Sequence, residues 1–517
     1  MEINSFFKVL LSLILIWLFG LFVKLYNTLI AKPLKLRLAL QKQGIRGPPG
    51  TLLLGNLLEI HNAFSHASIA SGTSNDFPVS HNIQSILFPF VDRWLEKYGD
   101  IFMISIGSTQ ILGVAKPEMV REIMNTSANF DKPPYYMELL KPLFGDGVIT
   151  SSGAKWNSQR KILAPEFRLE KLKGMIKLIQ EAAVTVVEQW NAEIEKAAQG
   201  GIAEIHIDEH MRRFSAEVIS RTCFGSSYIE GEEIFSKLTT LWLTVSKNLE
   251  FYAIPGMRHI PTKRNREIKA LEKEIQTSIL KVIEERKQAG IEKNLLQTIL
   301  EAAKSSGLSQ DSANKFIVDN CKNIYLAGYE TTAVSAQWCL VLLSVYPEWQ
   351  NRVRSEVIEV CKGQLPDHDM IFRMKQLTKV INETLRLYTP VPVLPREAFA
   401  DMKFGDICIP KGLNIWLLAT TLHTDPKVWG PNANEFNPDR FENGVAGACT
   451  HPYLYMPFGS GVRICVGQNF ALLELKILIS LLLSHFSFSL SPKYVHSPTY
   501  RVVIEPQHGV HLLVKKL

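Results

Sequence analysis

One ten-residue stretch near the C-terminus constrains this chain more than any other feature. It runs Phe458-Gly-Ser-Gly-Val-Arg-Ile-Cys-Val-Gly467, and a helical pattern starts almost at once, at Phe470. Gly461 and Gly467 permit backbone conformations that let the chain approach a flat ligand closely. The N-terminal end of the following helix would favour the thiolate form of Cys465. The stretch therefore predicts a ligating cysteine, and a plain buried cysteine in a glycine-rich turn is the alternative.

Two more side chains of this stretch suit a ligand site. Arg463 can pair with a carboxylate of the ligand, and Phe458 can shield the sulfur from water. The chain has seven cysteines in 517 residues. The other six are widely scattered and no C-x-x-C pair occurs, which excludes a zinc ribbon or a thioredoxin motif. Those six are interpreted as reduced, mostly buried thiols.

The pattern F-x-x-G-x-R-x-C-x-G resembles that of the cytochrome P450 family, although Val462 stands where that family often has proline. The resemblance implies the cytochrome P450 fold, which is mainly α with a small β region in a single large haem-thiolate domain. It also implies haem b as the cofactor, with Cys465 as the axial ligand of the iron.

Hydrophobic periodicity and turn signals favour the same fold class, one large α-rich domain. They predict helices at Lys263–Ala289, Ser312–Tyr346, Phe372–Leu387 and Phe470–His485, and strands at Ile101–Ile106, Gln110–Val114, Ile407–Ile409 and Leu413–Leu418.

The N-terminus is almost entirely apolar from Val9 to Val23, with Lys8 and Lys24 placed to reach the two membrane interfaces. Basic residues follow up to Arg46 and predict a cytosolic catalytic domain on a single-pass anchor in the endoplasmic reticulum membrane. We predict a transmembrane anchor over residues 1–30, a basic, proline-rich hinge over 31–50 and the catalytic domain over 51–517. A cleaved signal peptide is disfavoured because no small-x-small cleavage site follows.

Much of the excess positive charge behind the net charge of +7 lies in this basic stretch. No nucleic-acid-binding motif accompanies it, so nucleic acid is not an expected partner. Basic residues such as Lys155 and Lys161 could dock an acidic flavoprotein reductase.

The segment Ala327-Gly-Tyr-Glu-Thr-Thr332 lies inside the predicted long apolar helix. A threonine hydroxyl there can bond to a carbonyl one turn back and loosen the helix locally. The segment resembles the family's oxygen-activation segment. That resemblance implies that Thr331 hydrogen-bonds the oxygen being activated and that Glu330 helps relay protons, while Ala327 and Gly328 leave room over the haem. An ordinary core helix is the alternative.

Other motifs carry roles through the resemblance alone. Glu383, Arg386 and Arg440 are implied to form a structural network that braces the haem-binding core. The haem propionates are implied to be held by Trp156, Arg160, Arg396 and Arg463. The substrate cavity is implied to be lined by Val391, Val393 and Leu394, although Tyr388-Thr-Pro390 departs from the Tyr-Pro-Pro of many relatives. The loop from Asp131 to Ile149 is expected to decide much of the substrate preference.

Several stretches resemble the plant clan that contains the secologanin-forming enzymes: Gln43–Pro49, Cys223–Ser227, Val318–Asn323 and Glu505–Val510. The last two are most similar to the gibberellin-oxidising branch. The resemblance implies an NADPH- and O2-dependent monooxygenase, served by NADPH–cytochrome P450 reductase, that hydroxylates or epoxidises a polycyclic terpenoid, above all a gibberellin-type diterpenoid. Three alternatives remain: hydroxylation of a pentacyclic triterpenoid acid, a reductase-independent haem-thiolate isomerase, and a non-catalytic haem sensor.

Overall fold

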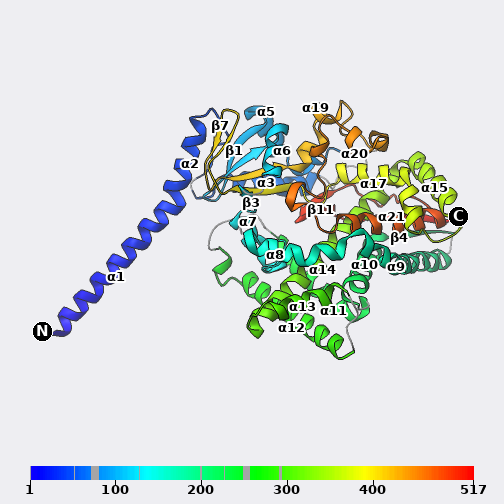
Figure 1. Ribbon diagram of the computed structural model, residues 1–517. Helices are drawn as coiled ribbons and strands as arrows, with labels where there is room; N and C mark the ends of the chain where they lie inside the picture. Colours follow the sequence, from blue (N-terminus) through cyan, green and yellow to red (C-terminus); the bar gives the residue numbers. More distant parts are fainter. Residues whose placement is uncertain are drawn as a thin grey trace.

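A computed structural model describes residues 2–51, 53–70, 81–126, 129–197, 201–225, 228–247, 257–289 and 294–517. Helices make up most of it. Strands such as β1 (Ile101–Ile106) lie at the end of the body to which the N-terminal helix connects, whereas β4 (Ile202–His206) lies at the opposite end, near the C-terminus (Figure 1). That first helix projects away from the body. The predicted fold class, mainly α with a small β region and an apolar N-terminal helix, is confirmed.

The α-helices are α1 (Glu2–Tyr26), α2 (Lys32–Gln41), α3 (Leu57–Ala70), α4 (Ile83–Leu87), α5 (Pro89–Tyr98), α6 (Pro117–Asn125), α7 (Pro134–Phe144), α8 (Gly153–Leu163), α9 (Leu169–Lys196), α10 (Ile207–Ile219), α11 (Tyr228–Ser246), α12 (Lys263–Ala289), α13 (Leu295–Ser305), α14 (Gln310–Val345), α15 (Pro347–Cys361), α16 (His368–Arg373), α17 (Lys375–Leu387), α18 (Ala419–Thr424), α19 (Pro426–Trp429), α20 (Gly444–Gly447) and α21 (Gln468–His485). The predicted helix at 263–289 is α12, and those at 312–346 and 470–485 are α14 and α21. The one predicted at 372–387 is interrupted, because the backbone of Met374 is not helical (φ −74°, ψ 81°).

The strands are β1 (Ile101–Ile106), β2 (Thr109–Val114), β3 (Phe130–Asp131), β4 (Ile202–His206), β5 (Val393–Ala398), β6 (Met402–Phe404), β7 (Ile407–Ile409), β8 (Asn414–Leu418), β9 (Phe486–Leu490), β10 (Pro498–Arg501), β11 (Val503–Pro506) and β12 (His511–Lys516). The predicted strands are confirmed. β1 and β2 form an antiparallel hairpin with Ile106 opposite Thr109. The largest sheet has the order β1-β2-β8-β5-β3, so β8 joins β2 and β5, while β7 pairs with β6.

The long helix α14 runs through the middle of the body (Figure 1). It contacts α7, α10, α17 and α21, and α9 packs against α10 and α21. Trp190 of α9 and Trp338 of α14 are fully buried in this helical core. A second, smaller core lies around the largest sheet, with Leu112 and Ile415 at its centre. The long helix is therefore held on several sides at once, which fixes where its polar segment lies.

Across residues 2–41 the backbone is helical without a break, because a π-helical turn at Asn27–Ala31 joins α1 to α2. The predicted boundary between anchor and hinge at residues 30 and 31 falls inside this continuous helix. Phe6–Gln41 is the one helix, among the described residues, that is long and apolar enough to cross a membrane. Its apolar side chains, such as Trp17 and Phe19, are exposed, as expected for a segment that faces lipid.

The glycine- and proline-rich segment that follows lies against the sheet. Arg37 donates a hydrogen bond to the carbonyl of Pro48 (2.8 Å), and Met103 of β1 donates its N–H to the carbonyl of Arg46 (3.0 Å). A Cβ at Gly47 would lie 1.8 Å from the carbonyl oxygen of Met103, so only glycine permits this close approach.

Candidate active site

The cysteine loop lies between a short 3₁₀ turn at Pro452–Leu454 and the start of α21. The N–H of Cys465 donates to the carbonyl of Phe458 (2.8 Å), which closes the loop. Gly459 and Gly461 have positive φ angles of 72° and 67°. A Cβ at Gly461 would lie 2.1 Å from the carbonyl oxygen of Met124, so this glycine lets the loop pack against the end of α6.

The sulfur of Cys465 faces an open side although protein surrounds the loop. Its side chain is exposed, yet burial raises the pKa of its thiol. Both observations hold if the open side faces an interior space rather than bulk solvent. Burial is opposed by the backbone N–H groups of Gly467 and Gln468 at the start of α21 and by the charge of Arg160. The start of α21 therefore favours the thiolate, as the sequence predicts. Burial outweighs this effect on the pKa, and a bound metal would supply the missing charge.

Positive charge gathers beside this open side. Arg463 pairs with the carboxylate of Asp131 and also donates to the carbonyl of Ser151 (3.0 Å). Burial lowers the pKa of Lys132 to about 7, with Arg463 and Arg396 adding to that shift. Burial likewise lowers the pKa of Arg396 to about 10. Among the described residues, the carboxylate of Asp131 acts on Lys132, Arg396 and Arg463, and Arg160 of α8 adds a fourth cation beside Cys465.

A buried cluster of this kind is costly unless further negative charge binds. The side chain of Arg396 donates to the carbonyl of its neighbour Pro395 and to the sulfur of Met124 (3.4 Å), neither of which carries a charge. The guanidinium of Arg463 stacks over the ring of Trp156, with 3.9 Å between its carbon and the ring centroid. A planar ligand with two carboxylates and a metal that accepts a thiolate fits this set of donors.

The middle of α14, a helix that packs against α21, is a second candidate wall of the site. Between Ile317 and Leu343 the side chains of this helix are buried, apart from Ala327, Gly328 and Thr331. These three are half-buried and lie on one face, at positions i, i+1 and i+4. Val391, Val393 and Leu394, on the approach to β5 and at its start, are also half-buried. A strip of partial exposure inside the body indicates that this face of α14 borders the interior space.

Gly328 and Thr331 of the α14 segment make different contacts, Gly328 with α10 and Thr331 within α14 itself. A Cβ at Gly328 would lie 2.2 Å from Cδ1 of Ile219, and the carbonyl of Gly328 accepts a hydrogen bond from Ser215 (2.9 Å). The missing side chain at Gly328 therefore permits close packing of α10 on α14. That Ala327 and Gly328 leave room over the haem stays a prediction. The Thr331 hydroxyl donates to the carbonyl of Ala327 (2.5 Å), one turn back.

Glu330 lies next to Thr331 but is buried against α10. Its carboxylate pairs with Arg212 of that helix (3.3 Å), and Arg212 also pairs with Glu505 of β11 (3.0 Å). Burial raises the pKa of the Glu330 carboxyl, against the opposing effect of Arg212. A carboxyl with a raised pKa exchanges protons near neutral pH more readily than a surface carboxyl does.

Glu383, Arg386 and Arg440 are brought together in the structure. Arg386 binds both carboxylate oxygens of Glu383 (2.7 and 2.8 Å), and neither side chain is exposed. Arg440 contacts one of the same oxygens (3.3 Å). Arg386 also donates to the carbonyls of His423 and Ala433 (2.7 and 2.6 Å). The three charged groups therefore connect α17 to the segments that precede the cysteine loop.

A buried histidine continues this connection to the cysteine loop. Nδ1 of His423 contacts the carbonyl of Arg386 (3.1 Å), and its Nε2 accepts the N–H of Met456 (3.0 Å). Met456 in turn accepts the N–H of Gly459. These partners require a neutral ring with its proton on Nδ1. Burial, together with Arg386, lowers the pKa of His423 to about 3, which keeps the ring neutral.

Comparison with known proteins identifies this architecture. The cytochrome P450 profile matches residues 78–513. The chain belongs to the cytochrome P450 family. It is 46% identical to cytochrome P450 714C2 of Oryza sativa subsp. japonica, with 96% of each chain covered. It is 43% identical to cytochrome P450 714B3 of Zea mays, with 99% of this chain and 96% of that one covered. It is 40% identical to cytochrome P450 714A2 of Arabidopsis thaliana, with 97% of each covered.

A cytochrome P450 is a monooxygenase that binds haem through a cysteine thiolate and receives electrons from NADPH through a reductase. In this P450, Cys465 lies in the loop that carries the family's cysteine motif. The assignment of Cys465 to the iron, and of Arg160, Arg396, Arg463 and Trp156 to the carboxylates of the cofactor, stays a prediction.

Sequence reasoning missed Lys132, Asp131 and His423. Lys132 is recognisable in the structure because its Nζ donates to the carbonyl of Ile149 (2.6 Å) and its charge acts on Cys465. Its sequence signal was weak, a lysine between an aspartate and two prolines. His423 has no local signal at all, since a lone histidine in a short helix gives no hint of its partners.

Replacing the ligand tests the assignment of the sulfur. We expect Cys465→Ser to abolish the red-shifted Soret band that thiolate-ligated haem gives when it is reduced and bound to carbon monoxide. Absorption spectroscopy of the purified variant measures this, and Cys408→Ser, at an exposed cysteine on β7, is the control that should keep the band. A variant at Cys465 that kept it would show that another residue holds the iron.

The buried histidine makes the fold sensitive to acid. The folded pKa of His423, about 3, lies below the ordinary 6.5, so its contribution is complete above pH 6.5 and is lost as pH falls toward 3. As pH falls from 7 to 5.5, protonation of this histidine in the unfolded chain should lower the free energy of unfolding by about 1 kcal/mol. His423→Gln should remove that part of the pH dependence, measured by urea unfolding at both pH values. His508→Gln, at an exposed position, should leave it unchanged. Equal pH dependence in all three proteins would contradict the assignment.

Proposed function

We propose that this cytochrome P450 hydroxylates or epoxidises a polycyclic terpenoid, a gibberellin-type diterpenoid, with electrons from NADPH–cytochrome P450 reductase. The observation that supports it is the half-buried strip of Ala327 and Thr331 on α14, a helix that packs against α21 directly after the cysteine loop. Apolar side chains at Val391, Val393 and Leu394 suit a rigid hydrocarbon skeleton. The choice of a gibberellin rests on the resemblance of Val318–Asn323 and Glu505–Val510 to that branch.

The chain's own polar groups have separate tasks in this proposal. Thr331 offers its hydroxyl at the reaction face, and its donation to the carbonyl of Ala327 leaves the oxygen free to accept. Glu330, paired with Arg212, helps to relay protons behind that face. The haem supplies oxygen activation when bound. The side chains orient the substrate, exclude water and bring the protons.

We further propose that the protein lies in the endoplasmic reticulum membrane with its catalytic domain in the cytosol. The exposed apolar helix Phe6–Gln41 supports a single-pass anchor. The basic residues after the apolar run, such as Lys32 and Lys35, support the cytosolic side for the body. In that orientation the cysteine side of the domain is accessible to a membrane-bound reductase.

A product screen tests the substrate. The full chain, co-expressed with a plant reductase, is given gibberellins, kaurenoic-type acids and oleanane or ursane acids, and products are identified by mass spectrometry. We expect a gain of one oxygen on a gibberellin-type diterpenoid. A gain of one oxygen only on a triterpenoid acid would replace the diterpenoid proposal with the alternative from specialised metabolism. Product formed without NADPH or O2 would indicate an isomerase.

The threonine pair on α14 provides a matched test of proton delivery. Thr331→Ala should retain haem but divert electrons to hydrogen peroxide, lowering product formed per NADPH by about tenfold or more. Thr332→Ala changes the same residue type one position on, where the side chain is buried away from the reaction face, and should leave this yield unchanged. Oxidation of NADPH, peroxide and product are measured together. An unchanged yield in Thr331→Ala would remove the threonine from the proton path.

A further inference from the structure

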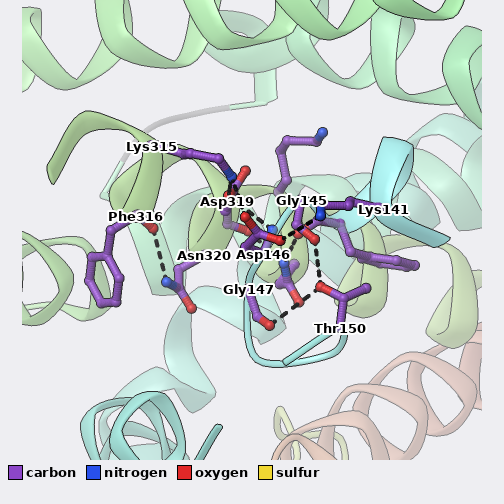
Figure 2. Close-up of polar contacts among 12 residues, drawn as sticks. Lys141, Gly145, Asp146, Gly147, Thr150, Lys315, Phe316, Asp319 and Asn320 are labelled. Carbon is purple, nitrogen blue, oxygen red and sulfur yellow. Dashed lines mark hydrogen bonds and ion pairs between the residues drawn. The ribbon is translucent and has the colours of Figure 1, made fainter. Parts of the chain in front are cut away.

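One of the two stretches that resemble the gibberellin-oxidising branch, residues 318–323, has no part in the site described so far. Val318-Asp-Asn-Cys-Lys-Asn323 lies on α14, about one to two and a half turns before the Ala327–Thr332 segment. Three polar side chains of this stretch point toward the end of α7 and the loop that follows it, residues 142–149. Figure 2 shows how Asp319 and its neighbours on α14 meet that loop.

The contacts are made almost entirely to backbone groups. The carboxylate of Asp319 accepts the N–H of Asp146 (2.9 Å). Asn323 accepts the N–H of Ile149 (2.8 Å) through Oδ1 and donates to the carbonyl of Phe144 (2.6 Å) through Nδ2. Side chains that bond backbone groups on both sides of a turn fix where the turn lies, whatever its own side chains are.

Lys322 adds a further contact of the same kind. Its buried ammonium group donates to the carbonyl of Pro142 (2.7 Å), inside the last turn of α7. The carbonyls in the last turn of a helix have no hydrogen-bond partner within the helix, so they need such donors.

Two glycines make this approach possible. A Cβ at Gly145 would lie 1.9 Å from Oδ1 of Asp319, and a Cβ at Gly147 would lie 2.0 Å from Nδ2 of Asn323. The loop is closed on itself by Thr150, whose hydroxyl donates to the carbonyl of Gly145 (2.5 Å). Glycines and α14 side chains therefore fit each other as one unit, here called the α14 clamp: Asp319, Lys322 and Asn323 with the loop Gly145–Thr150.

The other side of the same loop is tied to the haem-binding charges. The carbonyl of Ile149 accepts a hydrogen bond from the ammonium group of Lys132, and the carbonyl of Ser151 accepts one from the guanidinium of Arg463. Near the start of α7, Tyr135 accepts a hydrogen bond from Trp416 of β8 (2.7 Å). The helix α7 is thus fixed at both ends, between the propionate side of the site and α14.

We propose that Asp319 and Asn323 are positioning residues that set where α7 lies beside the reaction face of α14, and so decide which carbon of a large substrate is oxidised. Neither residue touches the reacting atoms in this proposal, because they act through the backbone of residues 144–149. The claim about the oxidised carbon rests on the function proposed above, whereas the claim about the shape of the site does not.

Charge and backbone contacts can be separated experimentally. Asn323→Asp keeps the size of the side chain but turns its donor nitrogen into an oxygen that faces the carbonyl of Phe144. Asp319→Ala removes the acceptor for Asp146. Lys315→Gln is the matched control, because exposed Lys315 forms ion pairs with Asp146 and Asp319 but makes no backbone contact across the clamp.

Two measurements on the haem-loaded enzyme do not depend on any terpenoid. Hydrogen exchange of the peptide that spans residues 145–151 should be about tenfold faster in both variants, because each loses about one backbone hydrogen bond. Titration of the ferric enzyme should change the Kd for 4-phenylimidazole at least about threefold, while the Kd for imidazole, which is small, stays the same. The control should match the parent in both.

Product analysis completes the test. With a substrate from the screen, the ratio of regioisomeric products should change in both variants and not in Lys315→Gln. Faster exchange with unchanged Kd values and product ratios would reduce the clamp to a structural contact and overturn the proposal. If Asn323→Asp loses haem, Asp319→Ala decides. A changed Kd for 4-phenylimidazole without reaction of any terpenoid would keep the clamp and reject the proposed substrate.

Discussion

The ion pair between Glu383 and Arg386 is the interaction on which the rest of the site depends. Neither side chain is exposed, and removing one partner of a buried pair leaves an uncompensated charge that costs about 3–5 kcal/mol. Arg386 then uses its remaining donors on the carbonyls of His423, Ala433 and Glu435. Because His423 holds the N–H of Met456, the position of the cysteine loop follows from a pair that lies outside the reaction space.

The reaction space itself is built from exceptions to ordinary packing. A helix buried along most of its length is half-exposed at Ala327, Gly328 and Thr331. A cysteine within the body is exposed, and the cationic side chains of Lys132, Arg396 and Arg463 gather around the carboxylate of Asp131. Each of these arrangements would be unfavourable in a protein that bound nothing. Together they describe the complement of a planar, dianionic cofactor that carries a metal.

The sequence alone predicted the elements and the family, because periodicity and motif spacing are local properties. Such patterns predicted α12 and the β1–β2 hairpin, and the residue types around Cys465 predicted the cysteine loop. The sequence could not predict partners made by distant segments. His423 has no local signal and Lys132 only a weak one. The contact of Gly328 with Ile219 depends on how α10 crosses α14, which no local pattern reports. The interruption at Met374 was also missed, since a side-chain pattern does not report a single backbone angle.

The unbroken helix from Glu2 to Gln41 has a mechanical consequence. Leu40 and Ile45, at its far end, are buried in the core around the largest sheet, so the helix is embedded in the body rather than tethered to it. A rigid helix of this kind would fix the distance of the body from the bilayer and its orientation relative to the bilayer. Adding one residue within it would raise the body by about 1.5 Å and turn it by about 100° around the axis of the helix. The number of residues in this helix would therefore decide which side of the enzyme faces the lipid surface.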